Sequence, residues 1–255
     1  GGEDYDATLE QKGWDLRGFE PADSWSNAVE AESPKGALKA QMSPALKVKV
    51  TFQPQKVTQP KPGVYVVDLG QNFSGWTKIT VKANKGAAVK CIPGERLNDD
   101  GTVSQKFTGK PTYFKYTAKG EGEETWHPRF SYTGFRYVQI EGAAVKLPLG
   151  GSPLSSFQPA EFGTEAVLLN IEGQMIYPDF EAIGTFESSN ALINRTHEII
   201  NWAILSNTKS VFTDCPHREK LGWLEQVHLV GPSIMYNYPI EDLLTKIMDD
   251  IRDAQ

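Results

Sequence analysis

The sequence contains only two cysteines and four histidines among its 255 residues. Cys91 and Cys215 lie far apart, so the sequence has neither the density of a disulfide scaffold nor the paired spacing of a zinc site. We expect two buried thiols, because free cysteine is among the most buried residue types. The histidines do not cluster either, and we expect no bound metal and no cofactor.

Long apolar runs and basic clusters are also missing. The most apolar pieces, such as "AVLLNI" from Ala166 to Ile171, are too short to cross a bilayer. The net charge is −6 and no stripe of lysine and arginine alternates with aromatic residues, which disfavours nucleic acid and acidic membranes as partners. Residues 1–10 lack the features of a signal peptide. The compartment stays open, with a periplasmic or secreted location favoured over a cytoplasmic one.

What the sequence does contain, from Leu46 to Glu187, is a series of short runs rich in β-branched and aromatic residues. Several runs alternate apolar and polar residues, and turn signals such as Lys61-Pro62-Gly63 separate them. Many strands at this spacing without helices between them predict a mainly β fold, an antiparallel β-sandwich. The predicted strands are "LKVKVTF" (46–52), "GVYVVDL" (63–69), "TKITVKA" (77–83), "AAVKCI" (87–92), "TYFKYTA" (112–118), "FRYVQIEG" (135–142) and "AIGTFES" (182–188).

The hydrophobic period changes after Glu187. Ser188 to Asn190 supply helix-capping residues, and apolar residues then recur at helical spacing from Leu192 to Ile204. A second helix is expected after Pro239, with its apolar stripe ending four residues before the C-terminus. Two amphipathic helices have little chain left to cover them, so we expect residues 188–255 to begin a larger helical domain. We expect a connector at 1–45, a β-sandwich domain at 46–187, and cuts at both ends of the chain.

Five segments in order along the chain carry a family resemblance. They are "GGEDYDATLEQKGW" (1–14), "GVYVVDLGQNFSGW" (63–76), "ETWHPRFSYTGFRYVQIEG" (124–142), "GTFESSN" (184–190) and "DCPHREKLGW" (214–223). This combination resembles the inverting bacterial α-L-rhamnosidases. The resemblance implies the tail of a β domain, a concanavalin-like β-sandwich and the first helices of an (α/α)6 barrel. It also implies a substrate that is a rhamnose-containing glycan or glycoside.

The last of these segments supplies the candidate site. Inverting hydrolysis of a glycoside needs one carboxylic acid to protonate the leaving oxygen and one carboxylate to activate water. The resemblance implies that Glu219 is the general acid and that Asp214 and Arg218 orient the sugar. The neighbouring cations would lower the pKa of a carboxyl group, so burial or a nearby carboxylate would have to outweigh them. The resemblance places the general base beyond Gln255, so we expect this chain alone to be inactive.

One part of the segment departs from the family pattern. Family members commonly continue after the tryptophan with a further residue and then Gly-Asp-Ala, whereas this chain reads "LEQVHL" from Leu224. Depending on a one-residue offset, Gln226 occupies the position of the missing acid or Glu225 takes its place. A glutamine can hold a sugar hydroxyl but cannot ionise. Trp223 is the tryptophan that we expect beside a sugar. We assign the other tryptophans to cores or to contacts between domains.

Other interpretations remain open. The segment from Asp214 to Trp223 would also suit an ordinary polar loop, in which Asp214 caps a helix and Arg218 pairs with Glu219. His217 could be a loop histidine, and His197 and His228 core or boundary residues. The β-sandwich could bind carbohydrate without cleaving it, or serve as a rigid support for the barrel. Uncovered helix faces predict self-association.

Overall fold

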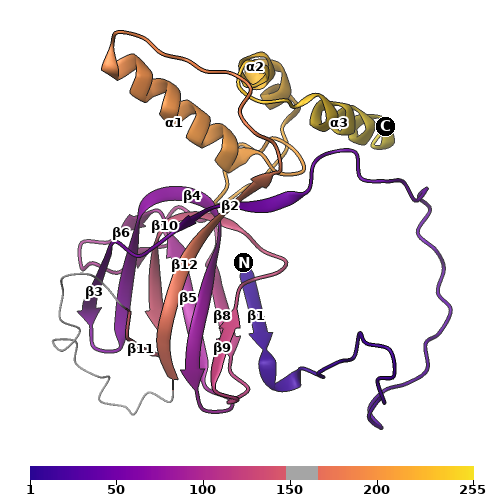
Figure 1. The fold of residues 1–255 in the computed structure, drawn as a ribbon, viewed down its shortest axis with the longest axis vertical. Coiled ribbons are helices and arrows are strands. Elements are labelled where there is room, and N and C mark those ends of the chain that lie inside the picture. The colour runs from indigo at the N-terminus through magenta and orange to yellow at the C-terminus, as the bar shows by residue number, and fades with distance from the viewer. Residues whose placement is uncertain (148–165) are drawn as a thin grey trace.

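The computed structural model describes residues 1–147 and 166–255, and Figure 1 shows their arrangement. Three helices gather at one end of a curled sheet, and a long irregular segment after the first strand leads back toward them. The strands are β1 (Gly2–Asp6), β2 (Leu46–Phe52), β3 (Lys56–Lys61), β4 (Val64–Ala83), β5 (Ala88–Gly94), β6 (Arg96–Leu97), β7 (Val103–Ser104), β8 (Tyr113–Thr117), β9 (Glu123–Trp126), β10 (Thr133–Glu141), β11 (Ala144–Val145) and β12 (Ala166–Pro178). A 3-10 turn, Ala7–Leu9, follows β1, and the helices are α1 (Ala191–Asn207), α2 (Leu224–Met235) and α3 (Glu241–Asp253).

The 20-residue strand β4 organises the sheet. Its first half pairs with β3 and β10, and its second half pairs with β9 and β12. Across the described residues the order is β1-β8-β5-β10-β4-β12-β11, and β2 pairs with β12. All these pairs are antiparallel except β1 with β8 and β11 with β12. The predicted mainly β, concanavalin-like fold followed by helices is therefore confirmed.

The curled sheet encloses one apolar core. Along β4 the side chains alternate, so that one set points into the core while the other meets solvent or a neighbouring layer. Burying each large apolar side chain contributes about 1.5–3 kcal/mol of transfer free energy. The largest fully buried side chains of this core are Tyr65, Leu69, Phe73, Ile79, Phe114, Phe135, Ile140, Leu147, Leu168, Ile171 and Met175.

The N-terminal residues add an edge strand that the sequence did not reveal. β1 pairs in parallel with β8, and the Glu3 carboxylate accepts hydrogen bonds from the backbone N–H groups of Arg129 and Phe130 at 2.8–3.0 Å. The connector expected at 1–45 therefore begins with a strand that belongs to the sheet. The sequence "GEDYD" is too polar to show the usual strand pattern.

Helix α1 joins the helical part to the sheet. It begins as expected, because the Asn190 side chain accepts the backbone N–H of Leu192 at 2.9 Å. Trp202 on this helix donates its indole N–H to the backbone oxygen of Asn72 in β4 at 2.5 Å, and its ring lies 5.9 Å from that of Phe52. A second, smaller core holds the helices together and contains Phe180, Phe212, Ile234, Tyr238, Ile240, Leu243 and Ile247.

One predicted strand is absent, and one helix was not predicted. The predicted strand at 182–188 is irregular, because the backbone N–H of Ile183 bonds to the oxygen of Asn237 at 2.8 Å in the helical part. Helix α2 was not predicted, because Pro232 interrupts its pattern and its N-terminus has no capping side chain. Among the described residues, none of the helices is long and apolar enough for a membrane span.

Candidate active site

The segment Thr213–Trp223, which we call the motif loop, connects the end of α1 to the start of α2. Asp214 closes this loop. Its carboxylate accepts the backbone N–H of Leu221 and the thiol of Cys215, both at 3.1 Å. Burial alone would raise the pKa of Asp214, but these hydrogen bonds outweigh it and lower the pKa. Asp214 is thus an ionised group that fixes the shape of the loop.

The motif loop is fastened to the β-sandwich at its middle. The Pro216 carbonyl accepts the backbone N–H of Gly134 in β10 at 3.0 Å. A Cβ atom on Gly134 would lie 2.7 Å from Cγ of Pro216, so the close approach requires glycine. His217 places Nδ1 3.6 Å from the Glu95 carboxylate, and Asn72 donates to the same carboxylate at 2.8 Å. The sandwich therefore determines where this loop lies.

Lys220 makes the second attachment. It has φ +56°, the one positive φ outside glycine among the described residues, and such a conformation is costly for lysine. Its ammonium donates to the backbone oxygen of Tyr132 and lies 4.4 Å from the centre of that ring. Burial lowers the pKa of Lys220. These contacts compensate for the strained backbone and hold the residue that follows Glu219.

Lys209 lies on the same tyrosine and is deeply buried. Its ammonium is 5.3 Å from the Tyr132 ring centre and donates to the backbone oxygens of Leu205, Ser206 and Thr208 at 3.1–3.5 Å. Burial, with a smaller contribution from Lys220, lowers the pKa of Lys209 to about 7. Nothing in the sequence had indicated that Lys209 would be buried.

The acid implied by the resemblance lies in an exposed part of the loop. The side chains of Arg218 and Glu219 are 51% and 46% exposed, and their Nε and Oε1 atoms are 3.7 Å apart. The burial that we expected around a proton donor is therefore not supplied by the described residues. The sequence-based pairing of Arg218 with Glu219 is present, as a surface contact.

The remaining candidates lie at the start of α2. Trp223 is 49% exposed and precedes the helix, Glu225 is exposed in its first turn, and Gln226 is half-buried with its N–H bonded to the Trp223 carbonyl at 3.0 Å. Trp223 lines a groove of about 420 Å³ against α3. The structure thus places Asp214, Arg218 and Glu219 on one loop, and Trp223, Glu225 and Gln226 at the adjoining helix start.

Two hollows flank the motif loop. A cavity of about 720 Å³ between α1 and β4 is lined by Asn72, Arg195, Asp214 and other residues. A smaller one of about 240 Å³ includes Phe107 and Arg218, and both hollows are lined by Glu95 and His217. Sequence reasoning missed Asn72, Glu95 and Tyr132, because each lies in or beside a strand and only the fold brings it to the loop.

Several single-residue expectations are settled by burial. Cys91 is fully buried, and burial raises the pKa of its thiol to about 12, whereas Cys215 is only half-buried.

His197 is a boundary residue as expected, with Nε2 3.0 Å from the Asn237 side chain, but His228 is exposed. Trp14 and Trp25 are also exposed rather than in a core. Residues 1–147 and 166–255 contain no cluster of potential metal ligands.

Comparison with known proteins gives consistent matches along the chain. Residues 1–50 match the α-L-rhamnosidase N-terminal domain, 58–155 the bacterial α-L-rhamnosidase concanavalin-like domain, and 181–255 the bacterial α-L-rhamnosidase 6 hairpin glycosidase domain. A curated α-L-rhamnosidase of Formosa agariphila is 34% identical over 99% of this chain and 25% of its own length. One of Streptomyces avermitilis is 33% identical over the whole chain and 23% of its own length.

Solved structures agree with these matches. The α-L-rhamnosidase of Dictyoglumus thermophilum superimposes with a TM-score of 0.83 at 38% identity, over 98% of this chain and 26% of that one. The Streptomyces avermitilis enzyme, crystallised with L-rhamnose, gives 0.80 at 33% identity, over 98% of this chain and 23% of that one. The chain spans about a quarter of the length of the curated relatives it matches.

The fold and these matches define a class of protein in which a concanavalin-like β-sandwich precedes a six-hairpin glycosidase domain. Each domain, relative and solved structure named above is described as an α-L-rhamnosidase or as a domain of one. The chain belongs to the bacterial α-L-rhamnosidase family.

Proposed function

We propose that this chain is part of an α-L-rhamnosidase that hydrolyses terminal α-L-rhamnosyl linkages with inversion of the anomeric centre. The observation that carries the proposal is the attachment of the acid-bearing motif loop to the β-sandwich, through Pro216 on Gly134 and Lys220 on Tyr132. Catalysis by general acids depends on precise placement of the proton donor. A loop anchored on both sides of Glu219 suits that requirement.

In this mechanism Glu219 protonates the leaving glycosidic oxygen. Its exposed carboxyl group is free to reach a substrate, and Arg218 beside it is available to contact a sugar hydroxyl. The second carboxylate, which activates water on the opposite face of the sugar, would lie about 6.5–9.5 Å from the first. We assign that general base to a part of the enzyme outside residues 1–255. The isolated chain is accordingly proposed to be inactive.

Asp214 has a positioning role in this proposal. Two loop donors, Cys215 and Leu221, already occupy one site on each carboxylate oxygen, and each oxygen retains a further lone pair for a sugar hydroxyl. Trp223 offers an exposed indole face for a sugar ring. Glu225 and Gln226, at the start of α2, are proposed to contact hydroxyl groups, with Gln226 unable to take the place of an acid.

The β-sandwich is proposed to support the barrel. It supplies Gly134, Tyr132 and Glu95 to the motif loop and Asn72 to α1, so the loop cannot move without disturbing sheet contacts. The substrate class, a rhamnose-containing glycan or glycoside, agrees with the sugar that was crystallised with the Streptomyces avermitilis relative.

The test is hydrolysis of aryl α-L-rhamnosides by the full-length enzyme that contains this chain. Glu219→Gln keeps the size of the side chain and removes the acid, so kcat should fall by about 10²–10⁴-fold for a poor leaving group. The loss should be smaller for an activated phenol, which leaves without protonation. Glu241→Gln, which changes an exposed carboxylate in the first turn of α3 outside the candidate site, is the matched control and should leave kcat unchanged. Equal rates for Glu219→Gln and the unmodified enzyme would refute the assignment.

A further inference from the structure

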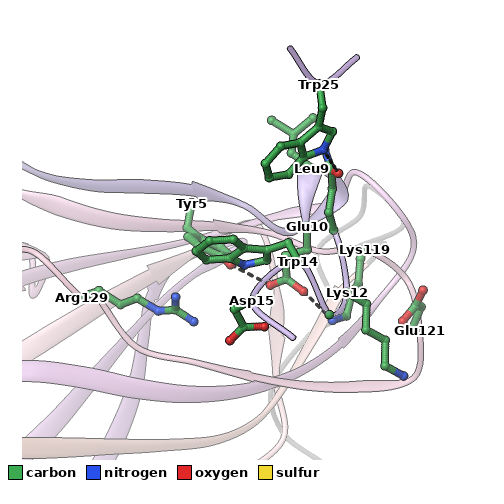
Figure 2. Close-up of a pocket in the computed structure, with 12 residues that line it drawn as sticks. Tyr5, Leu9, Glu10, Lys12, Trp14, Asp15, Trp25, Lys119, Glu121 and Arg129 are labelled. Atoms are coloured by element: carbon green, nitrogen blue, oxygen red, sulfur yellow. Dashed lines mark hydrogen bonds and ion pairs between the residues drawn. The ribbon is translucent and has the colours of Figure 1, made fainter. Parts of the chain in front are cut away.

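Another hollow lies beside the N-terminal strand β1 and the 3-10 turn that follows it, at the end of the sheet away from the helices (Figure 1). It has a volume of about 620 Å³ and is formed by residues 5–15, by Trp25 and by two loops of the β-sandwich. Figure 2 shows its side chains, with Arg129 on one side and Lys119 and Glu121 on the other. None of its lining residues belongs to the motif loop or to the helices.

Exposed aromatic faces form the wall of this hollow. Trp14 is 63% exposed and Trp25 is 46% exposed. The indole N–H of Trp25 donates to Gln11 at 2.5 Å, and its ring packs edge-on against Phe19 at 5.6 Å. These contacts hold the ring while leaving part of it open. Exposed large aromatic surfaces of this kind are typical of binding sites rather than of ordinary surface.

Ordered polar groups form the floor. The Tyr5 hydroxyl and the Lys119 ammonium both donate to the Glu10 carboxylate, each at 2.8 Å. Lys119, more than any other group, lowers the pKa of Glu10, so this carboxylate is an ionised acceptor in a fixed position. The Arg129 guanidinium lies 5.8 Å from the Tyr5 ring centre and adds hydrogen-bond donors.

The charges around the hollow cancel. Three cationic side chains face three carboxylates. This balance gives no net attraction for a phosphate, a uronate or a polycation. The cations are Lys12, Lys119 and Arg129, and the carboxylates are Glu10, Asp15 and Glu121.

We propose that this hollow is a binding subsite for a neutral pyranoside, separate from the Glu219 loop. A neutral sugar ring has an apolar face that stacks on an indole and an edge of hydroxyl groups that pair with carboxylates and guanidinium groups. Trp14 and Trp25 supply the first kind of contact, and Glu10 and Arg129 supply the second. The subsite would hold a glycan away from the point of cleavage, and it does not depend on the proposed catalytic role of Glu219.

The test uses the 255-residue chain itself. Its six tryptophans give six indole N–H signals in a nitrogen–proton correlation spectrum, and single variants assign those of Trp14 and Trp25. The probes are methyl α-L-rhamnopyranoside, methyl β-D-galactopyranoside and D-galacturonate. At least one neutral glycoside should shift the Trp14 and Trp25 signals in a saturable way. Galacturonate should shift them less at equal concentration.

Variants make the result specific. Trp14→Ala and Arg129→Ala should each raise the dissociation constant of the neutral glycoside by about tenfold, the equivalent of roughly 1.4 kcal/mol of binding free energy. Both side chains are exposed, so the fold should survive, which the dispersion of the remaining signals would show. Tyr236→Ala, which removes a ring that is 81% exposed and does not line the hollow, is the matched control and should leave binding unchanged.

Three results would overturn the proposal: no saturable shift with either neutral glycoside, equal affinity in Trp14→Ala, or tighter binding of galacturonate. A shift confined to Trp223 would place the sugar at the motif loop instead, and would count against this subsite while supporting the proposed function. If Glu219→Gln lowered the rate of hydrolysis but Trp14→Ala left sugar binding unchanged, the proposed function would be supported and the subsite refuted.

Discussion

The ammonium group of Lys220 lies 4.4 Å from the centre of the Tyr132 ring, and it also donates a hydrogen bond to the backbone oxygen of Tyr132. These two residues are 88 positions apart in the sequence. Their contact joins the motif loop to the loop that enters β10. A contact between a cation and an aromatic face at a partly desolvated site contributes about 0.5–2 kcal/mol.

Removing this ring should loosen the motif loop. In Tyr132→Ala, we expect the Leu221 amide, which bonds to Asp214, to exchange its hydrogen about tenfold faster, a change equivalent to roughly 1.4 kcal/mol of local stability. Hydrogen exchange followed by NMR would measure it. Tyr236→Ala, which removes a tyrosine that is 81% exposed, is the control. Unchanged exchange at Leu221 in Tyr132→Ala would show that the ring does not hold the loop.

A side chain at Gly134 should force the motif loop away from the sheet. The added Cβ of Gly134→Ala would lie 2.7 Å from the Pro216 ring, which cannot bend aside. Overpacking of this kind costs about 1–3 kcal/mol. Urea unfolding should show that loss. Gly36→Ala is the matched control, because its Cβ would meet no atom within 4 Å. Equal stability of the two variants would mean that the loop adjusts freely.

Lys209 should make stability depend on pH. Its pKa is lowered to about 7 in the folded chain, against 10.5 without burial, so between these values the unfolded chain binds more protons. The free energy of unfolding should therefore rise with pH in this window, by about 1 kcal/mol per unit between pH 8 and 9. Urea titrations at several pH values would measure the slope.

The slope should be much smaller in Lys209→Met, which keeps an unbranched side chain and removes the charge, and any remainder comes from groups such as Lys220, whose pKa burial also lowers. Lys35→Met, at an exposed position, should retain the full slope. Parallel pH profiles for the unmodified chain and Lys209→Met would show that Lys209 is not the group responsible.

Exposed apolar side chains on α1 should promote association. Leu192 and Ile199 on this helix are 74% and 55% exposed. Sedimentation at high concentration should give an average mass above the 28.3 kDa of one chain. The double variant Leu192→Glu with Ile199→Glu should return it to the monomer value. Val29→Glu with Leu38→Glu, which alters two exposed residues outside the helices, should not. A monomer at every concentration would contradict this expectation.

The sequence predicted those elements whose local pattern agrees with their surroundings. β2 alternates apolar and polar residues in its sequence, β5 and β8 alternate in burial as half-buried strands do, and α1 and α3 carry apolar residues at helical spacing. β1 was missed because its stability comes from pairing with β8 at the sheet edge rather than from apolar residues. α2 was missed because tertiary contacts compensate for its internal proline and its missing cap.

The same limit applies to the site. The motif loop itself could be found from its residue types and from the family resemblance. Its attachments could not, because Glu95, Tyr132 and Gly134 are separated from it by many residues and carry no local signal. Only the register of β10 against β4 and β5 brings those residues to one end of the sheet.

The pairing of β4 has a practical consequence for cutting the chain into pieces. A gene fragment limited to residues 58–155, the extent of the concanavalin-like match, would encode β4 but neither β12 nor β1. The second half of β4 would then lose its pairing with β12, leaving backbone groups and apolar side chains open to solvent. Expression of such a fragment should give aggregated protein, whereas a fragment that runs from Gly1 through Pro178 keeps both strands.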